Sequence, residues 1–133
     1  MRVALLIVLS IFCLSPFAKE PPKVIQTVPA AKKPLVKVNP SRTCMIKNYL
    51  YKEKQKAIPL DGKTYYACCL PCERTLTLDE KSRWSEDPVT GEKIDKAKAV
   101  VAADKNGRIS YFKNEKTLAR QNLKLITLER KKP

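Results

Sequence analysis

Four of the five cysteines in this chain of 133 residues lie close together in the sequence, as Cys44, Cys68, Cys69 and Cys72. The chain has no histidine, so it can form neither a Ser-His-Asp triad nor an imidazole metal site. Any metal ion must therefore be held by cysteine thiolates or by oxygen ligands. A chain of this length forms one ordinary domain or two very small ones, which excludes a large cofactor-binding enzyme. We expect a binding protein and not an enzyme.

A β-hairpin is predicted immediately before the second cysteine. Asp61-Gly62 separates two apolar runs, and an Asp-Gly pair is a strong hairpin signal because glycine supplies the positive φ of the turn. The hairpin should cover residues 58–66 and place Cys68 at the end of its second strand.

The segment after the hairpin is predicted to be a helix over residues 70–78. Pro71 falls near its first turn, where the missing N–H costs nothing. If the helix begins here, Cys68, Cys69 and Cys72 are close enough in sequence for their sulfurs to meet on one face. A helix amino terminus also favours thiolate over thiol. The cysteines are therefore suited either to hold a soft metal ion or to form a reactive thiol pair.

The same residues carry a resemblance to known small modules. Cys44, Cys68 and Cys72, with Asp61-Gly62-Lys63-Thr64-Tyr65-Tyr66 before the second cysteine, resemble the TRASH and YHS families of metal-binding modules. Those families have a cysteine near the start, a G-K-x-Y-Y-F-C strand, and another cysteine four residues on at a helix start; here Ala67 stands in the Phe place. The resemblance covers residues 44–78. It implies heavy-metal binding for trafficking, resistance or sensing, with these three cysteines as ligands.

The rest of the chain repeats the pattern without cysteines. Asp87-Pro88-Val89-Thr90-Gly91 resembles the D-P-V-C-G opening of YHS modules, with Thr90 in the cysteine place. A strand, a hairpin turn, a second strand and a helix capped by Asn114 are predicted to follow, over residues 97–103, 104–107, 108–112 and 114–121. Their order also resembles that of the accessory lipoprotein of nitrous oxide reductase, a copper carrier. A closing strand is predicted over residues 123–128.

Superposing the glycines of the two hairpins indicates a tandem repeat in which Thr90, Lys113 and Thr117 replace the three thiols. A lysine ammonium has no lone pair and repels a cation, so the second copy should bind no metal. Its expected role is packing, because so short a unit buries little core alone. The alternative is a chance recurrence of strand, turn and helix.

The amino-terminal residues are predicted to direct export. Residues 1–18 have a short basic start and an apolar run too short to span a bilayer, which is typical of a secretory signal. We expect cleavage after Ala18, although Pro16 at the minus-three position leaves an uncleaved membrane anchor as an alternative. Residues 19–40 are rich in proline and lysine and are predicted to be an extended, disordered linker. The protein should then be periplasmic or secreted.

The charge balance is strongly basic. Lysine and arginine number 27 against 13 acidic residues, a net charge of +14 that becomes +13 (26 minus 13) once Arg2 leaves with the signal. Nucleic-acid readers rely on arginine, whereas lysine dominates here, so no nucleic-acid partner is expected. An acidic partner protein or an anionic membrane surface fits the charge; a solvated lysine-rich surface is the plain alternative.

The predicted fold is α+β, with two tandem hairpin-plus-helix modules of treble-clef or YHS type at residues 41–83 and 84–130. The favoured function is an exported protein that binds Cu(I) or Zn(II), because three thiolates suit a soft ion. Zinc normally has a fourth ligand, which Cys69, Asp61 or water could supply. Two alternatives stay open: a thiol-disulfide oxidoreductase using Cys69-x-x-Cys72, and a domain stapled by disulfides that holds no metal.

Overall fold

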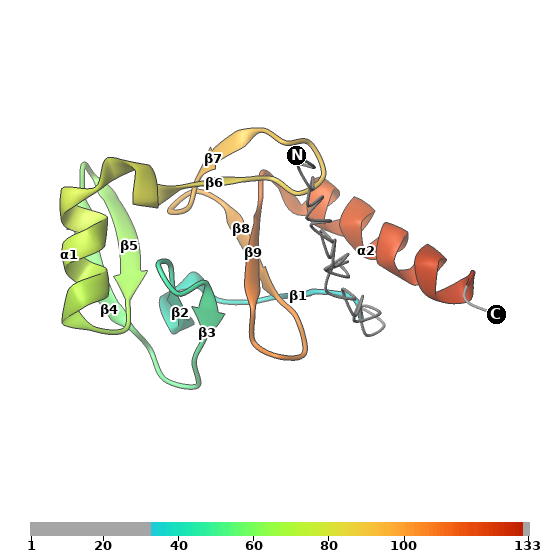
Figure 1. Cartoon of the computed structure of the whole chain (residues 1–133), viewed down its shortest axis with the longest axis horizontal. Coiled ribbons are helices and arrows are strands. Elements are labelled where there is room, and N and C mark those ends of the chain that lie inside the picture. Colours follow the sequence, from blue (N-terminus) through green and yellow to red (C-terminus); the bar gives the residue numbers. More distant parts are fainter. Residues whose placement is uncertain (1–32, 132–133) are drawn as a thin grey trace, which may run out of the picture.

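The computed structural model describes residues 33–131. Within this part the architecture is mixed α/β, with small antiparallel sheets and two α-helices (Figure 1). None of the helices in this part is long and apolar enough to cross a membrane. The predicted signal peptide and residues 19–32 of the predicted linker lie outside the described residues.

The elements follow one another in short segments. In chain order they are β1 (Val36–Lys37), η1 (Pro40–Arg42), β2 (Thr43–Cys44), β3 (Tyr49–Leu50), β4 (Lys56–Leu60), β5 (Lys63–Ala67), α1 (Leu70–Leu78), η2 (Glu80–Arg83), β6 (Trp84–Glu86), β7 (Lys93–Asp95), β8 (Val100–Ala103), β9 (Ile109–Phe112) and α2 (Glu115–Arg130). Strands β1, β8 and β9 form a three-stranded sheet in the order β1-β8-β9, and β2-β3, β4-β5 and β6-β7 form two-stranded pairs.

The hairpin and helix predicted around the cysteines are both confirmed. Strands β4 and β5 pair with Leu60 opposite Lys63, and the turn between them has Asp61 at φ 52° and Gly62 at φ 70°. Helix α1 follows at once, with Cys69 as its N-cap and a proline in its first turn. Its buried residue Leu76 packs into the core. This hairpin and helix form one end of the molecule in Figure 1.

The second hairpin is also confirmed, but the end of the chain differs from the prediction. Strands β8 and β9 pair as expected, and Asn114 caps α2 through a capping box with Thr117. The helix then continues to Arg130, so the closing strand predicted over residues 123–128 is wrong. Leu118 and Leu125 are both buried and lie two helical turns apart on one face, which favours a helix.

Part of the predicted linker is structured. Val36 pairs with Ala103, so β1 adds an edge strand to the sheet of the second hairpin. The side chain of Asn122 on α2 accepts a hydrogen bond from the backbone N–H of Leu35 at 2.8 Å and donates to its carbonyl at 2.9 Å. The linker prediction, which ran to Pro40, is therefore wrong for these residues.

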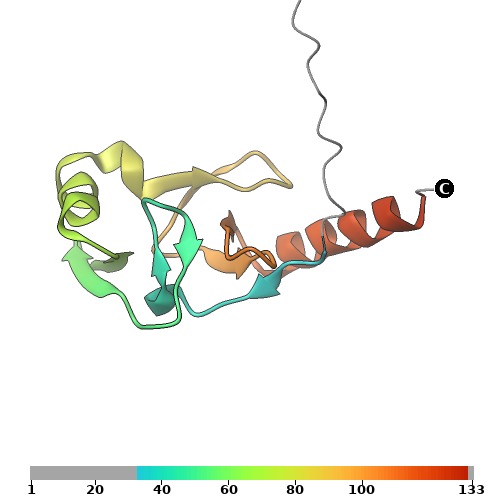
Figure 2. The same cartoon turned by 60° about the horizontal axis from the view of Figure 1, so that its bottom comes forward.

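One hydrophobic core joins the two halves of the chain. Met45, Leu76 and Val101 belong to the same buried cluster, although they come from β2, α1 and β8 or their flanking turns. The buried ammonium of Lys96 donates to the carbonyl of Met45 at 2.7 Å. Helices α1 and α2 lie at opposite ends of this body, and α2 projects away from it (Figure 2). The turns that carry the cysteines are thus held by residues from both halves.

Candidate metal centre

Short elements place each cysteine at a point where the chain changes direction. Cys44 ends β2, Cys68 follows the last residue of β5, Cys69 is the N-cap of α1, and Cys72 lies in the first turn of that helix. The hairpin delivers Cys68 to the helix start, and the helical turn brings Cys72 back beside it. Cys44 joins them because the backbone N–H of Met45 donates to the carbonyl of Tyr66 at 3.0 Å.

Three of the sulfurs are close enough to share one ion. The Sγ atoms of Cys44, Cys68 and Cys72 all lie within 4.8 Å of one another, and those of Cys68 and Cys72 are 4.0 Å apart. Three sulfurs bound to one tetrahedral zinc at about 2.3 Å lie about 3.8 Å apart. Only a small closure of the trio is therefore needed to bind an ion, and the donor set fits a soft metal.

Cys69 lies beside this trio. Its Sγ is 3.3 Å from that of Cys72 and 3.8 Å from that of Cys68, but it does not belong to the group with Cys44 in which all sulfurs lie within 4.8 Å of one another. All four cysteines in the described part of the chain are free thiols, so the pairings that a disulfide-stapled domain requires are not formed in this structure.

The site has a buried side and an open side. Cys44 is fully buried and Cys72 is nearly so, while Cys68 and Cys69 are half-buried. The backbone N–H of Lys47 points at the Sγ of Cys44 at 3.5 Å. An ion bound here would contact the buried Cys44 and Cys72 on one side. Solvent would reach it from the side of Cys68 and Cys69.

The thiols differ in acidity. Burial raises the pKa of Cys68, but hydrogen bonds from the hydroxyl of Tyr51 and from the neighbouring thiols outweigh it, and its pKa is lowered to about 7. Burial raises the pKa of Cys72 well above that of an ordinary thiol, and hydrogen bonds with its thiol neighbours add to the rise. The negative charge of Cys68 also raises the pKa of the exposed Lys47. Cys68 is therefore the first of these two thiols to ionise.

Two residues beside the site were not singled out from the sequence. Tyr51 directly follows β3 and Lys47 lies in the turn before it, and the hairpin formed by β2 and β3 brings them to the thiols. Conversely, Asp61 is not brought to the site. It lies in the turn at the far end of β5, and its carboxylate is exposed and pairs with Arg83 at 2.7 Å. The suggestion of Asp61 as a fourth zinc ligand is therefore wrong.

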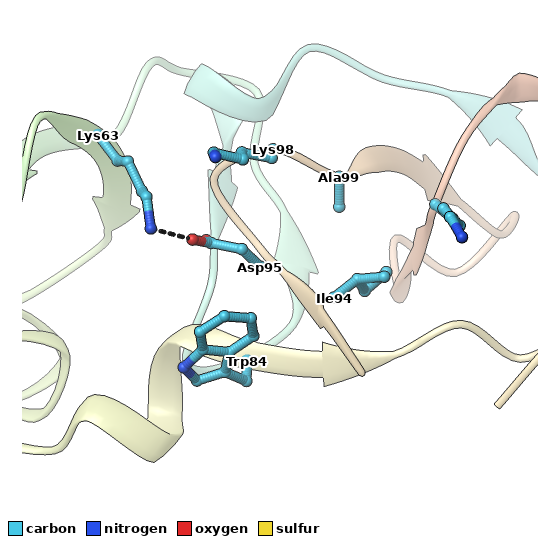
Figure 3. Close-up of a pocket in the computed structure, with 7 residues that line it drawn as sticks. Lys63, Trp84, Ile94, Asp95, Lys98 and Ala99 are labelled. Atoms are coloured by element: carbon cyan, nitrogen blue, oxygen red, sulfur yellow. Dashed lines mark hydrogen bonds and ion pairs between the residues drawn. The ribbon is translucent and has the colours of Figure 1, made fainter. Parts of the chain in front are cut away.

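A separate shallow pocket of about 310 Å³ is lined mostly by the second half of the chain, with Lys63 from the first half (Figure 3). Trp84 and Ile94 line it together with Lys63, whose ammonium is 2.7 Å from the carboxylate of Asp95. The hydroxyl of Tyr65 donates to the same carboxylate at 3.0 Å. Lys63 and Tyr65 already bind Asp95, so each of these three side chains has a polar partner without any ligand.

Comparison of the chain with protein-family models, curated proteins and solved structures gave no match. The resemblance to TRASH and YHS modules thus stays a prediction from sequence motifs. The case for a metal rests on the geometry of the thiols.

Proposed function

We propose that the protein binds one soft metal ion, Cu(I) or Zn(II), through the thiolates of Cys44, Cys68 and Cys72. The observation that carries this proposal is the mutual approach of the three sulfurs within 4.8 Å. The free state of the thiols supports it, because a thiolate binds metal only when it is not engaged in a disulfide. Binding, and not catalysis, is the role proposed for these residues.

The two metals differ in what they need from Cys69. Zinc takes four ligands, and the Sγ of Cys69, 3.3 Å from that of Cys72, is the nearest candidate besides water. Cu(I) is a soft ion and is well served by thiolates alone. Cys69 is accordingly proposed as an auxiliary ligand, needed for zinc if water does not take its place.

The cellular location, biological role and partners of the protein are proposed from its sequence motifs. A signal-like start supports export to the periplasm or beyond, and the TRASH-like and YHS-like motifs support a role in metal trafficking, resistance or sensing. The net charge of +14 favours an acidic partner protein or an anionic membrane surface, and the exposed Lys47 lies beside the open side of the site. Two tandem modules are proposed as the internal organisation.

Single cysteine variants of the reduced protein test the proposal. Equilibrium dialysis against Zn(II) or Cu(I) should give one ion per chain for the wild type and for Cys69→Ser with water as fourth ligand. Cys44→Ser, Cys68→Ser and Cys72→Ser should each lose at least tenfold in affinity, because a hydroxyl replaces a soft ligand. Loss in Cys69→Ser alone, with the other three variants unchanged, would contradict the assignment of ligands.

One observation favours a second function. The Sγ atoms of Cys69 and Cys72 are only 3.3 Å apart in a C-x-x-C at a helix start, which suits a thiol-disulfide oxidoreductase. Turnover of insulin with dithiothreitol measures this activity directly. If the protein takes up no metal and its turnover of insulin disappears in Cys69→Ser, the oxidoreductase function replaces the metal-binding proposal.

A further inference from the structure

The loops that precede the two hairpins share one register at their ends. Cys44 is paired with Tyr49, five residues later, and the backbone N–H of Asp87 donates to the carbonyl of Glu92, also five residues later, at 2.9 Å. In each loop the residue four positions after the first has a positive φ: 50° at Asn48, which precedes Tyr49, and 71° at Gly91, which precedes Glu92. The register therefore aligns Asp87 with Cys44.

The side chains of these two residues both accept from backbone N–H groups of their own loop. The N–H of Lys47, three residues on, points at the Sγ of Cys44 at 3.5 Å. Oδ1 of Asp87 accepts from the N–H of Val89 at 2.8 Å, and the N–H of Thr90, three residues on, points at it at 3.4 Å. Asp87 is fully buried, as Cys44 is. Thr90, which the sequence motif aligned with Cys44, is instead exposed.

The helix starts match as well. Cys69 and Asn114 are the N-caps of α1 and α2, both with φ of −159°. Counting from these caps places Lys113 at the position of Cys68 and Thr117 at that of Cys72. The backbone N–H of Lys113 donates to Oδ2 of Asp87 at 2.7 Å, so the carboxylate reaches the start of α2.

We infer that the carboxylate of Asp87 occupies, in the second half of the chain, the place that the metal ion and the Cys44 thiolate hold in the first. In the second half, hydrogen bonds from backbone N–H groups link the loop to the helix start, as metal–sulfur bonds would in the first half. The second half therefore keeps its fold without an ion. This inference rests on the proposed metal site. It also replaces Thr90 by Asp87 as the counterpart of Cys44, because the loop register, and not the DPV-G motif, decides which side chain points inward.

A second metal site should therefore be restored by three cysteines at the aligned positions. The test compares the triple variant Asp87→Cys/Lys113→Cys/Thr117→Cys with the control Thr90→Cys/Lys113→Cys/Thr117→Cys. Native mass spectrometry after exposure to Zn(II) counts the ions per folded chain. We expect one more ion than the wild type for the first variant and no more than the wild type for the control.

The outcomes separate this inference from the proposed function. A wild type without zinc removes the proposed function, and an extra ion in the Asp87 variant relative to that wild type still supports the alignment. No extra ion in a folded Asp87 variant, or an extra ion in the Thr90 control, overturns the inference. If the Asp87 variant does not fold, Asp87→Asn and Thr90→Val decide the question. Asp87→Asn should lower the melting temperature with the zinc count unchanged, and equal melting temperatures for the two variants would overturn the inference.

Discussion

The thiols of Cys68 and Cys72, whose Sγ atoms are 4.0 Å apart, differ strongly in acidity. The Tyr51 hydroxyl and the neighbouring thiols stabilise the thiolate of Cys68, whose pKa is about 7, against the effect of burial. Burial and the neighbouring thiols raise the pKa of Cys72. A metal ion must displace the proton from each of its thiol ligands, so Cys68 is the natural first point of attachment for an incoming ion.

Alkylation of the reduced, metal-free protein tests this difference. The thiolate is the nucleophile, so the rate of labelling of Cys68 by iodoacetamide should rise with pH to a midpoint near 7 and fall tenfold per unit well below it. Peptide mapping by mass spectrometry at pH 7 should find Cys68 labelled well before Cys72. Tyr51→Phe removes a hydrogen bond to the thiolate and should move the midpoint upward. Faster labelling of Cys72 would contradict this account.

The buried carboxylate of Asp87 predicts a stability that depends on pH. Burial raises the pKa of Asp87, but hydrogen bonds from the backbone N–H groups of Lys113 and Val89 outweigh it, so the pKa lies below its usual range. A depressed pKa stabilises the fold above the unfolded value of about 3.9, and this stability is lost as the pH falls through the folded value.

Urea unfolding of wild type and Asp87→Asn between pH 7 and pH 3 measures the effect. At pH 7 the variant should be less stable by about 2 kcal/mol, because a charged hydrogen-bond acceptor is lost. The two curves should converge as the pH falls below about 4. Curves that stay parallel over this range would assign the pH dependence to other carboxyl groups.

At the scale of elements, local signals served well where one residue type enforces a backbone geometry. The Asp61-Gly62 pair predicted the β4–β5 hairpin, and Pro71 predicted the start of α1. The prediction for the end of the chain was wrong. The branched residues over 123–128 suit a strand, whereas Leu118 and Leu125 are spaced for a helix. Packing of that helical face decided the outcome, and such packing depends on the sheet formed by β1, β8 and β9, which no local pattern reports.

Gly107, in the turn between β8 and β9, lies where the second hairpin contacts the first half of the chain. It has a φ of 80°, and a Cβ placed there would lie 3.0 Å from Cζ of Tyr49. Gly62, at φ 70°, has no such neighbour. Gly62→Ala should therefore cost about 1–2 kcal/mol for the left-handed backbone alone, and Gly107→Ala should cost roughly 1 kcal/mol more for the crowded ring.

Thermal or urea unfolding of the two glycine variants gives the comparison. In the double variant Gly107→Ala/Tyr49→Ala the extra cost of Gly107→Ala, measured relative to Tyr49→Ala alone, should disappear. Equal destabilisation by Gly62→Ala and Gly107→Ala would show that the contact with Tyr49 is relieved without cost.

At the scale of the whole molecule, the two halves contribute unequally to the candidate site and jointly to the core. Local spacing was enough to predict that Cys68, Cys69 and Cys72 lie together, because they share one helix start. Cys44 was assigned only by resemblance to known modules, since nothing local links it to residues so far along the chain. The turn that carries it is held by the Tyr66 carbonyl and, from the second half, by Lys96. That support is tertiary and could not be predicted from spacing.

X-ray absorption spectroscopy of the zinc-loaded, reduced full chain reports the atoms that surround the ion, and so shows whether Cys44, Cys68 and Cys72 bind it. We expect three sulfur atoms at about 2.3 Å from the zinc, completed by one oxygen or by the sulfur of Cys69. Cys44→Ser should remove one of these sulfur atoms. Oxygen and nitrogen atoms alone around the zinc, or a protein that retains no zinc when its thiols are reduced, would contradict this assignment of ligands.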